Sequence, residues 1–246
     1  MKINYIMPLS IVGLVSVTQA ATTVTTESSS GATSQIDAFT ASSIDLAQSG
    51  SSALLSSTIS NSGAFGDSGA NDLGNGLITN VNGTRGVFLS PTSGGMTDFP
   101  SVFNLTFDTS VNTLGYDISE ITTFAAWFNN GASLANQLYD LEFSVVGETS
   151  FNSLGQTNFI PFDGEAEDAS GATQVTHTGE NNAPLIASGV DAIRITFLDS
   201  GVLNGGVNGT VFQEVDVFGV ATTVPEPSST ALVGLGGLAL LLRRKK

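Results

Sequence analysis

The chain has no cysteine and only one histidine, His177. The first absence excludes disulfide scaffolds, thiolate metal sites and cysteine nucleophiles, and the second excludes metal centres built from several histidines. Positive charge is also scarce, with 7 Lys and Arg against 22 Asp and Glu in 246 residues. Between residues 21 and 224 only Arg85 and Arg194 remain against 21 acidic residues, a net charge of −19. No basic stripe is left to bind phosphates, which excludes nucleic-acid binding.

Hydrophobic residues make up 41% of the chain, and 15 of them are phenylalanine, so the chain can bury a core and is not disordered. Glycine is frequent, at 28 residues, whereas proline numbers only 7. This balance indicates many turns between short strands.

The first 20 residues have the pattern of a secretory signal peptide. Lys2 precedes a mostly apolar run, and small residues follow up to Ala20, so we expect cleavage between Ala20 and Ala21. A buried first helix is the alternative, but Pro8 and the β-branched residues disfavour it. Export from the cytosol follows from the signal peptide.

The opposite end combines a short motif, an apolar run and a basic end, in the order VPEPSSTALVGLGGLALLLRRKK. The uncharged stretch from Ser228 to Leu242 would extend about 22 Å as a helix, which is short for a hydrocarbon core of about 30 Å. The run is apolar all round, which disfavours an amphipathic core helix. Residues 224–246 resemble a PEP-CTERM sorting signal of exported bacterial proteins. The motif residues are Val224, Pro225, Glu226 and Pro227.

That resemblance implies a transient membrane anchor that a membrane-embedded exosortase recognises and cuts near the Pro-Glu-Pro motif. It also implies a Gram-negative bacterium that makes exopolysaccharide, with the mature protein at the cell surface or in the extracellular matrix. The mature protein would then lack the short apolar helix.

Alternating patterns dominate the remaining chain. Three runs place apolar side chains on one face and polar ones on the other: Phe103, Leu105 and Phe107; Tyr139, Leu141, Phe143 and Val145; Ile193, Ile195 and Phe197. Asn-Gly pairs at positions 82–83, 130–131 and 208–209 supply turns. Helical evidence is limited to a turn around residues 119–123.

We therefore predict an all-β fold, a single antiparallel β-sandwich of the jelly-roll type over residues 35–223, after a flexible leader over residues 21–34. Five fragments occur in an order that resembles a galactose-binding-like, discoidin-type jelly roll: NDLGNGLIT, LGYDISEITTFAAW, LYDLEFSV, GVDAIRITF and FQEVDVFG.

The segment Gly66-Asp67-Ser68-Gly69 matches the letters around the nucleophile of two serine-hydrolase families, but both matches fail. The chymotrypsin-like pattern needs its histidine before the serine, and the GDSL-type pattern needs an Asp where Gln174 stands. His177 is therefore interpreted as a surface residue, and no catalytic residue is predicted. The acidic loop at Asp163, Glu165, Glu167 and Asp168 is interpreted as a solvated turn, with adventitious Ca²⁺ as the alternative.

Asp72, Asn75 and Glu214 are the better candidates for a calcium site. Ca²⁺ prefers six to eight oxygen ligands, which a glycine-bearing loop closed by a distant carboxylate can supply. Similar jelly rolls bind a structural Ca²⁺ with such a loop and with the Glu of the last strand. The alternative is that Asp72 only caps a turn.

Trp127 is the only tryptophan and lies beside a predicted turn. Its ring could stack on a sugar, although core packing is the alternative. Arg194 is expected to pair with an acidic residue. Together these features predict an exported, non-enzymatic protein that binds carbohydrate, with exopolysaccharide as a partner, or alternatively a structural matrix protein without a defined ligand.

Overall fold

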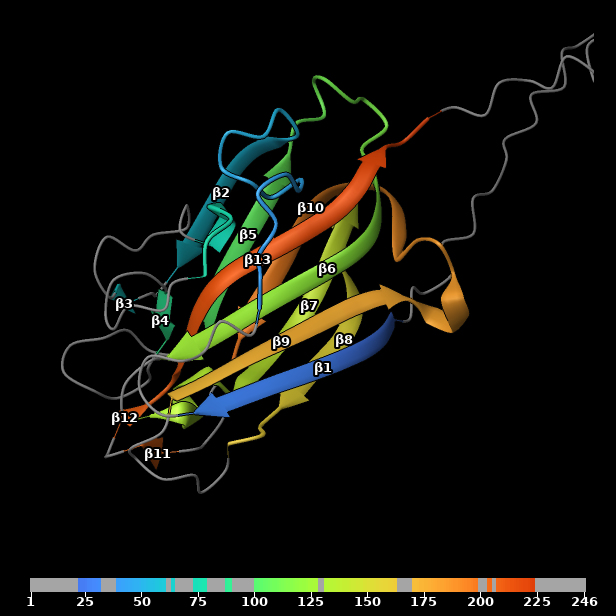
Figure 1. Ribbon diagram of the computed structural model, residues 1–246. Coiled ribbons are helices and arrows are strands. Elements are labelled where there is room, and N and C mark those ends of the chain that lie inside the picture. The colour runs from blue at the N-terminus through green and yellow to red at the C-terminus, as the bar shows by residue number, and fades with distance from the viewer. Residues whose placement is uncertain are drawn as a thin grey trace, which may run out of the picture.

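The computed structural model describes residues 22–31, 39–60, 63–64, 73–78, 87–89, 100–127, 131–162, 170–198, 203–204 and 207–223. These residues form an antiparallel β-sandwich, which confirms the predicted all-β class (Figure 1). Two short 3₁₀ turns accompany the strands, η2 (Ala132–Ala135) and η3 (Glu180–Asn182). In the described part of the chain, no helix has the length and apolarity needed to cross a membrane.

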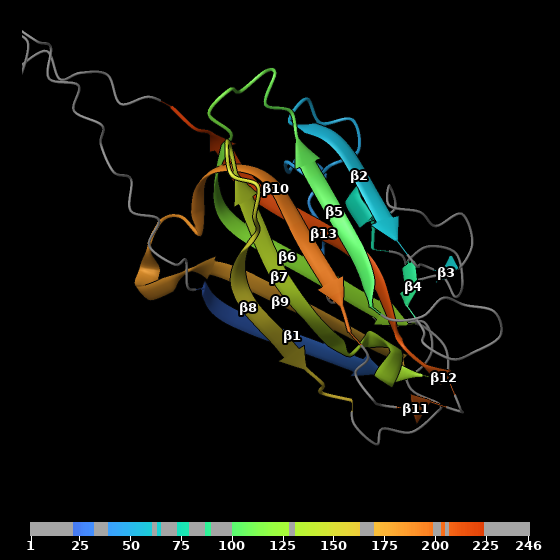
Figure 2. The ribbon, with the colours of Figure 1, turned by 180° about the vertical axis from the view of Figure 1, so that it is seen from behind.

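The strands lie in two layers, one in front of the other in Figure 1 and in reversed order in Figure 2. The strand order of the first layer is β1 (Thr22–Gly31), β9 (Ser170–Gly179), β6 (Tyr116–Trp127), β13 (Thr210–Ala221), β4 (Val87–Leu89), β3 (Gly63–Ala64). The order of the second layer is β2 (Leu54–Ser60), β5 (Ser101–Phe107), β10 (Ala187–Phe197), β7 (Gln137–Val145), β8 (Asn152–Phe159). A separate pair is formed by β11 (Leu203–Asn204) and β12 (Val207–Asn208).

The two layers are joined by hydrogen bonding at one end of the sandwich. The first residues of β10 pair with the first residues of β6, through Ala187 with Ile118 and Val190 with Tyr116. Further along, β10 pairs with β5 and β7 instead. All strands but those of the β11–β12 pair therefore belong to one continuous antiparallel ladder.

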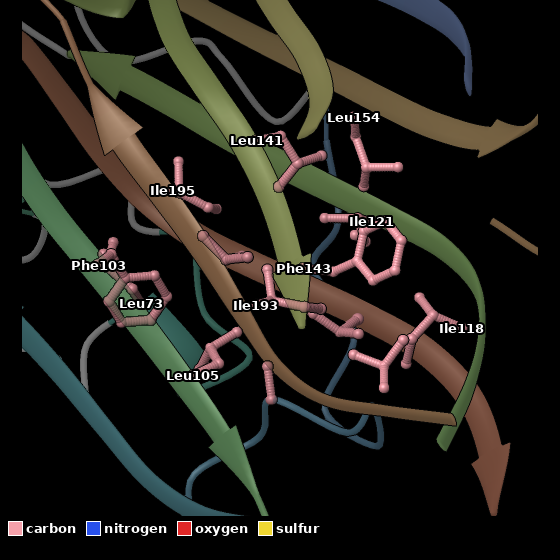
Figure 3. Close-up of a cluster of buried hydrophobic side chains, with 14 of the residues drawn as sticks. Leu73, Phe103, Leu105, Ile118, Ile121, Leu141, Phe143, Leu154, Ile193 and Ile195 are labelled. Carbon is pink, nitrogen blue, oxygen red and sulfur yellow. The ribbon is translucent and has the colours of Figure 1, made fainter. Parts of the chain in front are cut away.

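The core fills the space between the layers with the inward face of each alternating strand. Phe103, Leu105 and Phe107 of β5 are all buried, as the alternation predicted. So are Leu141 and Phe143 of β7 and the inward residues of β10 (Figure 3). Tyr139, Phe197 and Phe212 form an aromatic cluster, with 4.2 Å between the ring centroids of Phe197 and Phe212.

A polar network crosses the core between the layers. Tyr139 of β7 hydrogen-bonds through its hydroxyl to Nε2 of His177 at 2.9 Å and to Oγ1 of Thr123 at 2.9 Å. Thr157 of β8 is 3.1 Å from the same His177 nitrogen, and Gln137 bridges Thr123 to β9. Burial lowers the pKa of His177 to about 4, so its imidazole is neutral at pH 7.

Three expectations from the sequence differ from the structure. His177 is buried rather than on the surface, because it faces inward beside Val175 on β9. Residues 22–31, expected in a flexible leader, form the strand β1, which pairs with β9. Threonine favours strands, and at the edge of the layer the polar side chains can remain in water. Residues 119–123 lie inside β6 rather than in a helical turn.

Candidate functional site

Two loop segments lie across the outer face of the first layer, over β13 and β6. Leu46 donates its backbone N–H to the carbonyl of Val217 at 2.8 Å, which fixes residues 39–53 against β13. Ser49 donates its N–H to the carbonyl of Gly74, which ties the second segment, residues 73–78, to the first. The outer face of β13 is therefore covered, and its side chains there are buried.

Glu214 is the buried carboxylate at the centre of this face. It alternates with inward-facing Val215 on β13, so its side chain points to the loops. Its Oε2 accepts backbone N–H groups of three consecutive residues, Asn75 at 3.2 Å, Gly76 at 3.0 Å and Leu77 at 3.3 Å. Its Oε1 is buried and has no hydrogen-bond partner among the described residues.

Three more buried oxygens on β13 and the first loop lack a partner in the part of the chain that the structure describes. Asp216 accepts the N–H of Ser42 at 2.7 Å through Oδ2, while its Oδ1 is unpartnered. Asp45 accepts the N–H groups of Ala47 and Val217 through Oδ1, while its Oδ2 is unpartnered. The amide oxygen of Gln48 is the last of these. Because a buried acceptor without a partner costs about 1–3 kcal/mol, these four oxygens require an explanation.

The acidic groups of the site have raised pKa values. Burial, and then the negative charge of Asp216, raise the pKa of Glu214 to about 9. Burial raises the pKa of Asp216 to about 7, and the pKa of Asp45 is raised as well, again mainly by burial. The only basic side chain in the described residues is Arg194, which pairs with Glu142 on the other layer. No protein cation therefore compensates these carboxylates within the described part.

Gly76 allows the two loops to approach each other. Its φ of 73° lies in the left-handed region. A Cβ at this position would lie 2.8 Å from the carbonyl oxygen of Ser42 and 3.0 Å from the amide oxygen of Gln48. Oxygen atoms of the first loop therefore lie directly against the turn that holds Glu214.

The chemistry of this site fits a hard cation. Carboxylate, amide and carbonyl oxygens are the ligands of Ca²⁺, and the four unpartnered oxygens are of the first two kinds. In the described residues no three or more His, Cys, Asp or Glu side chains are arranged to hold a metal ion. A cation here would therefore need amide and backbone carbonyl oxygens in addition to the carboxylates.

The predicted calcium residues are partly brought together. The structure joins Asn75 and Glu214, but Asn75 contributes its backbone N–H, while its Oδ1 accepts the N–H of Leu77 at 2.9 Å. Asp72 lies outside the described residues. Sequence reasoning missed Asp45, Gln48 and Asp216. Of these, Asp216 could have been found, since alternation places it on the same face as Glu214.

Trp127 is the last residue of β6 and is half-buried, so it is not part of the core. It pairs with Gly171 at the start of β9. The other end of β6 begins at Tyr116, which pairs with Ala221, the last residue of β13. Trp127 therefore lies at the end of the sandwich opposite to the end where β13 leaves the fold (Figure 1).

Arg194 pairs with Glu142 at 2.7 Å and lies 4.0 Å from the ring centroid of Phe151, which confirms its predicted pairing with an acid. The remaining predicted positions lie outside the described residues: Ser68, the acidic loop at 163–168, Ala20 and Ala21, and the motif Val224, Pro225, Glu226 and Pro227.

Among solved structures, CpGH89CBM32-5 from Clostridium perfringens, in complex with GalNAc-β-1,3-galactose, is similar, with 11% identity and a TM-score of 0.39. That match covers 66% of this chain and 94% of the other. The CBM32-1 and CBM32-2 domains of Clostridium perfringens ZmpB, in complex with GalNAc, have 12% identity and a TM-score of 0.42, covering 83% and 42%. An F5/8 type C domain from Bacteroides fragilis has 15% identity and a TM-score of 0.36, covering 68% and 92%. No curated protein matches the chain.

The C-terminal end matches a family model directly. Residues 223–245 match the PEP-CTERM protein-sorting motif. The match begins one residue after Thr222. The backbone N–H of Thr222 donates to the carbonyl of Gly115 at 2.9 Å, which ties the end of β13 to the turn before β6. The chain is thus an exported protein that carries a PEP-CTERM sorting motif immediately after its β-sandwich.

Proposed function

We propose that this chain is an exported carbohydrate-binding protein without catalytic activity, released or transferred at the cell surface after an exosortase cuts near Pro225-Glu226-Pro227. The polysaccharide it binds is an exopolysaccharide of the extracellular matrix of a Gram-negative bacterium. The sequence resemblance to galactose-binding-like jelly rolls supports this class of ligand.

The observation that carries this proposal is the position of Trp127 relative to the sorting motif. While the precursor is anchored, the motif holds the end of β13 close to the membrane. The β6 strand spans 12 residues, so Trp127 lies about 36 Å from that end at ~3.3 Å per residue. The half-buried indole at that end, remote from the membrane, is the candidate on which a sugar ring would stack.

The buried network around His177 supports the absence of catalysis. Within the described residues its ring nitrogens contact only hydroxyls, those of Tyr139 and Thr157 at Nε2 and of Thr22 at Nδ1. A catalytic histidine needs an accessible nucleophile and a carboxylate that orients it. His177 has a structural role in the core instead.

The test is a glycan array probed with the mature protein recovered from the culture. Trp127→Ala should lose binding to the polysaccharides that the wild type retains, with an unchanged unfolding midpoint. Phe218→Ala is the matched control, because Phe218 is also a half-buried aromatic residue but lies at the opposite end of the sandwich. Absence of wild-type binding to any glycan, including the producer's own exopolysaccharide, would favour the structural matrix protein.

We also propose that the loop site over β13 holds a structural Ca²⁺. The buried oxygens of Glu214, Asp216, Asp45 and Gln48 that lack partners among the described residues support this proposal. Since no three of the described carboxylates are arranged to hold a metal ion together, the ion would lie at Glu214 and take its other ligands from amide and backbone carbonyl oxygens of the loops. Bound Ca²⁺ would compensate the acidic charge and fix both loops to β13. Calorimetry with Ca²⁺ and with Mg²⁺ at equal ionic strength tests it, since only a Ca²⁺-specific rise in the unfolding midpoint, lost in Glu214→Gln, supports the site.

A further inference from the structure

The end of the sandwich where β13 leaves the fold is closed by a tight junction of two turns with the end of β13. Gly189 donates its backbone N–H to Oδ1 of Asp117 at 3.3 Å and to Oγ1 of Thr222 at 3.2 Å, and it accepts the N–H of Val146 at 2.9 Å. Gly115, at φ 77°, lies so close that a Cβ there would be 2.6 Å from the Gly189 carbonyl. These contacts bring the turn before β6, the turn after β7 and the end of β13 to one point.

Asp117 holds Thr222, the residue after β13, in this junction. Its Oδ1 accepts the hydroxyl of Thr222 at 2.6 Å and that of Ser188 at 2.5 Å. Together with the Thr222 N–H bond to Gly115, these bonds keep the backbone ordered up to residue 222. No spacer therefore separates the fold from the sorting motif, which starts at residue 223.

Exposed aliphatic side chains surround this junction. Val111 is 63% exposed, Leu114 41%, Val146 39% and Val220 65%. Val146 bonds to Gly189, Leu114 precedes Gly115, and Val220 lies two residues before Thr222, so three of the four adjoin the junction directly. We name Val111, Leu114, Val146 and Val220 the exit patch. The loop that carries the first two is the green turn at the top of Figure 1.

Acidic side chains border the exit patch. Asp108 begins the turn that carries Val111 and Leu114, Glu148 follows Val146 by two residues, and Asp191 of β10 accepts the hydroxyl of Ser144. The described residues of this end include no Lys or Arg. A partner that fits this end therefore has an apolar centre with basic groups at its rim.

The distance between the fold and the motif decides which partner this is. Pro225 follows Thr222 by three residues, which reach at most about 10 Å when fully extended. An enzyme that binds Pro225-Glu226-Pro227 in a cleft is far larger than this gap, so its surface meets the end of the sandwich. An anionic lipid surface would instead repel the acidic border.

We propose that the exit patch is the docking surface for the membrane-embedded enzyme that processes the sorting motif. This inference rests on the proposed processing by an exosortase. The folded domain thereby contributes to recognition, in addition to the motif and the apolar segment.

The test is the rate at which the full precursor is converted to mature protein in the producing cells, measured by pulse-chase. The double variant Leu114→Ser and Val220→Ser should slow conversion by about tenfold, since two aliphatic contacts are lost from a small interface. Leu77→Ser is the matched control, because Leu77 is 48% exposed but lies beside Glu214, about 26 Å before Thr222 along the strand. The control should be processed at the wild-type rate.

A spacer variant separates docking from effects on folding or export. About twelve Gly and Ser residues inserted between Thr223 and Val224 lengthen the link, so the enzyme can bind the motif without contacting the end of the sandwich. Conversion of this variant should no longer depend on Leu114 and Val220. Equal slowing with and without the spacer, or no slowing in either, would overturn the docking proposal. Failure of the wild type itself to be processed would instead overturn the proposed sorting.

Cysteine labelling distinguishes an exit patch covered by the enzyme from one covered by the lipid surface. Since the chain has no cysteine, Thr113→Cys places a single thiol between Val111 and Leu114. In precursor whose motif is made uncleavable by Glu226→Ala, a membrane-impermeant maleimide should label this thiol in cells that lack the processing enzyme. Overproduction of the enzyme should protect it. Protection without the enzyme would assign the patch to the membrane surface and overturn the proposal.

Discussion

Replacing Glu214 with Gln tests the electrostatics of the loop site, because the amide keeps the shape but removes the charge. The ordinary pKa of this carboxyl is 4.5, and burial raises it to about 9. Between these values the folded protein keeps a proton that the unfolded chain has released. Stability from this group is therefore complete below pH 4.5 and is lost as the pH rises toward 9.

The size of the effect follows from these pKa values. Since each pH unit between these values is worth a little over 1 kcal/mol, the free energy of unfolding of the metal-free protein should fall by about 2–3 kcal/mol between pH 6.5 and 8.5. His177 contributes little in this window and with the opposite sign, because its folded pKa of about 4 lies far below the window and the unfolded chain releases only its remaining half proton above pH 6.5. Asp216, with a pKa of about 7, adds less than about 1 kcal/mol.

The assay is urea unfolding in EDTA at pH 6.5, 7.5 and 8.5, followed by the fluorescence of Trp127, the only tryptophan. Glu214→Gln should remove most of the pH dependence and be more stable than the wild type at pH 8.5. Glu148→Gln, a change to an exposed carboxyl that accepts a bond from Asn152, should keep the wild-type slope. A wild-type free energy of unfolding that stays level from pH 6.5 to 8.5, or a Glu214→Gln slope equal to that of the wild type, would refute the reasoning.

Three further predictions concern the fold. The wild type should lose about 2–3 kcal/mol of stability between pH 6.5 and pH 4.5, because the unfolded chain protonates His177 while burial keeps it neutral in the fold; His177→Gln should remove most of this loss, as measured by urea unfolding at the two pH values. Asp117→Ala removes the acceptor for Ser188, Gly189 and Thr222, so it should destabilise the domain by about 1–2 kcal/mol and speed amide exchange at Thr222. Phe212→Ala should cost about 3–5 kcal/mol in thermal unfolding, because Phe212 is fully buried against Phe197.

The strands could be predicted from the sequence because burial on one face leaves a simple pattern. Phe103, Leu105 and Phe107 are buried while the residues between them are half-buried, as alternation requires. Strand β1 was missed because its side chains are polar on both faces, so no alternation marks it. The helical turn expected around residues 119–123 is wrong. In β6 the buried residues Ile118 and Ile121 are three positions apart, a spacing that departs from the alternation of a regular strand.

The candidate site was only partly predictable, because its chemistry depends on long-range contacts. Glu214 was identified through its place in the last strand, and Asn75 through its loop. Asp45 and Gln48 stand in a polar segment without a motif, and only the packing of that segment onto β13 makes them functional candidates. His177 was misplaced for the same reason, since its partners Tyr139 and Thr157 come from the opposite layer.

The intact mass of the protein recovered from the outside of the producing cells tests the central claim of export and sorting most directly. We predict a species that begins at Ala21 and has lost the apolar segment from Ala231 to Leu242, with an end near Pro225-Glu226-Pro227. Mature protein that still carries residues 231–246 would contradict the account, since the tail would then be a permanent anchor rather than a sorting signal.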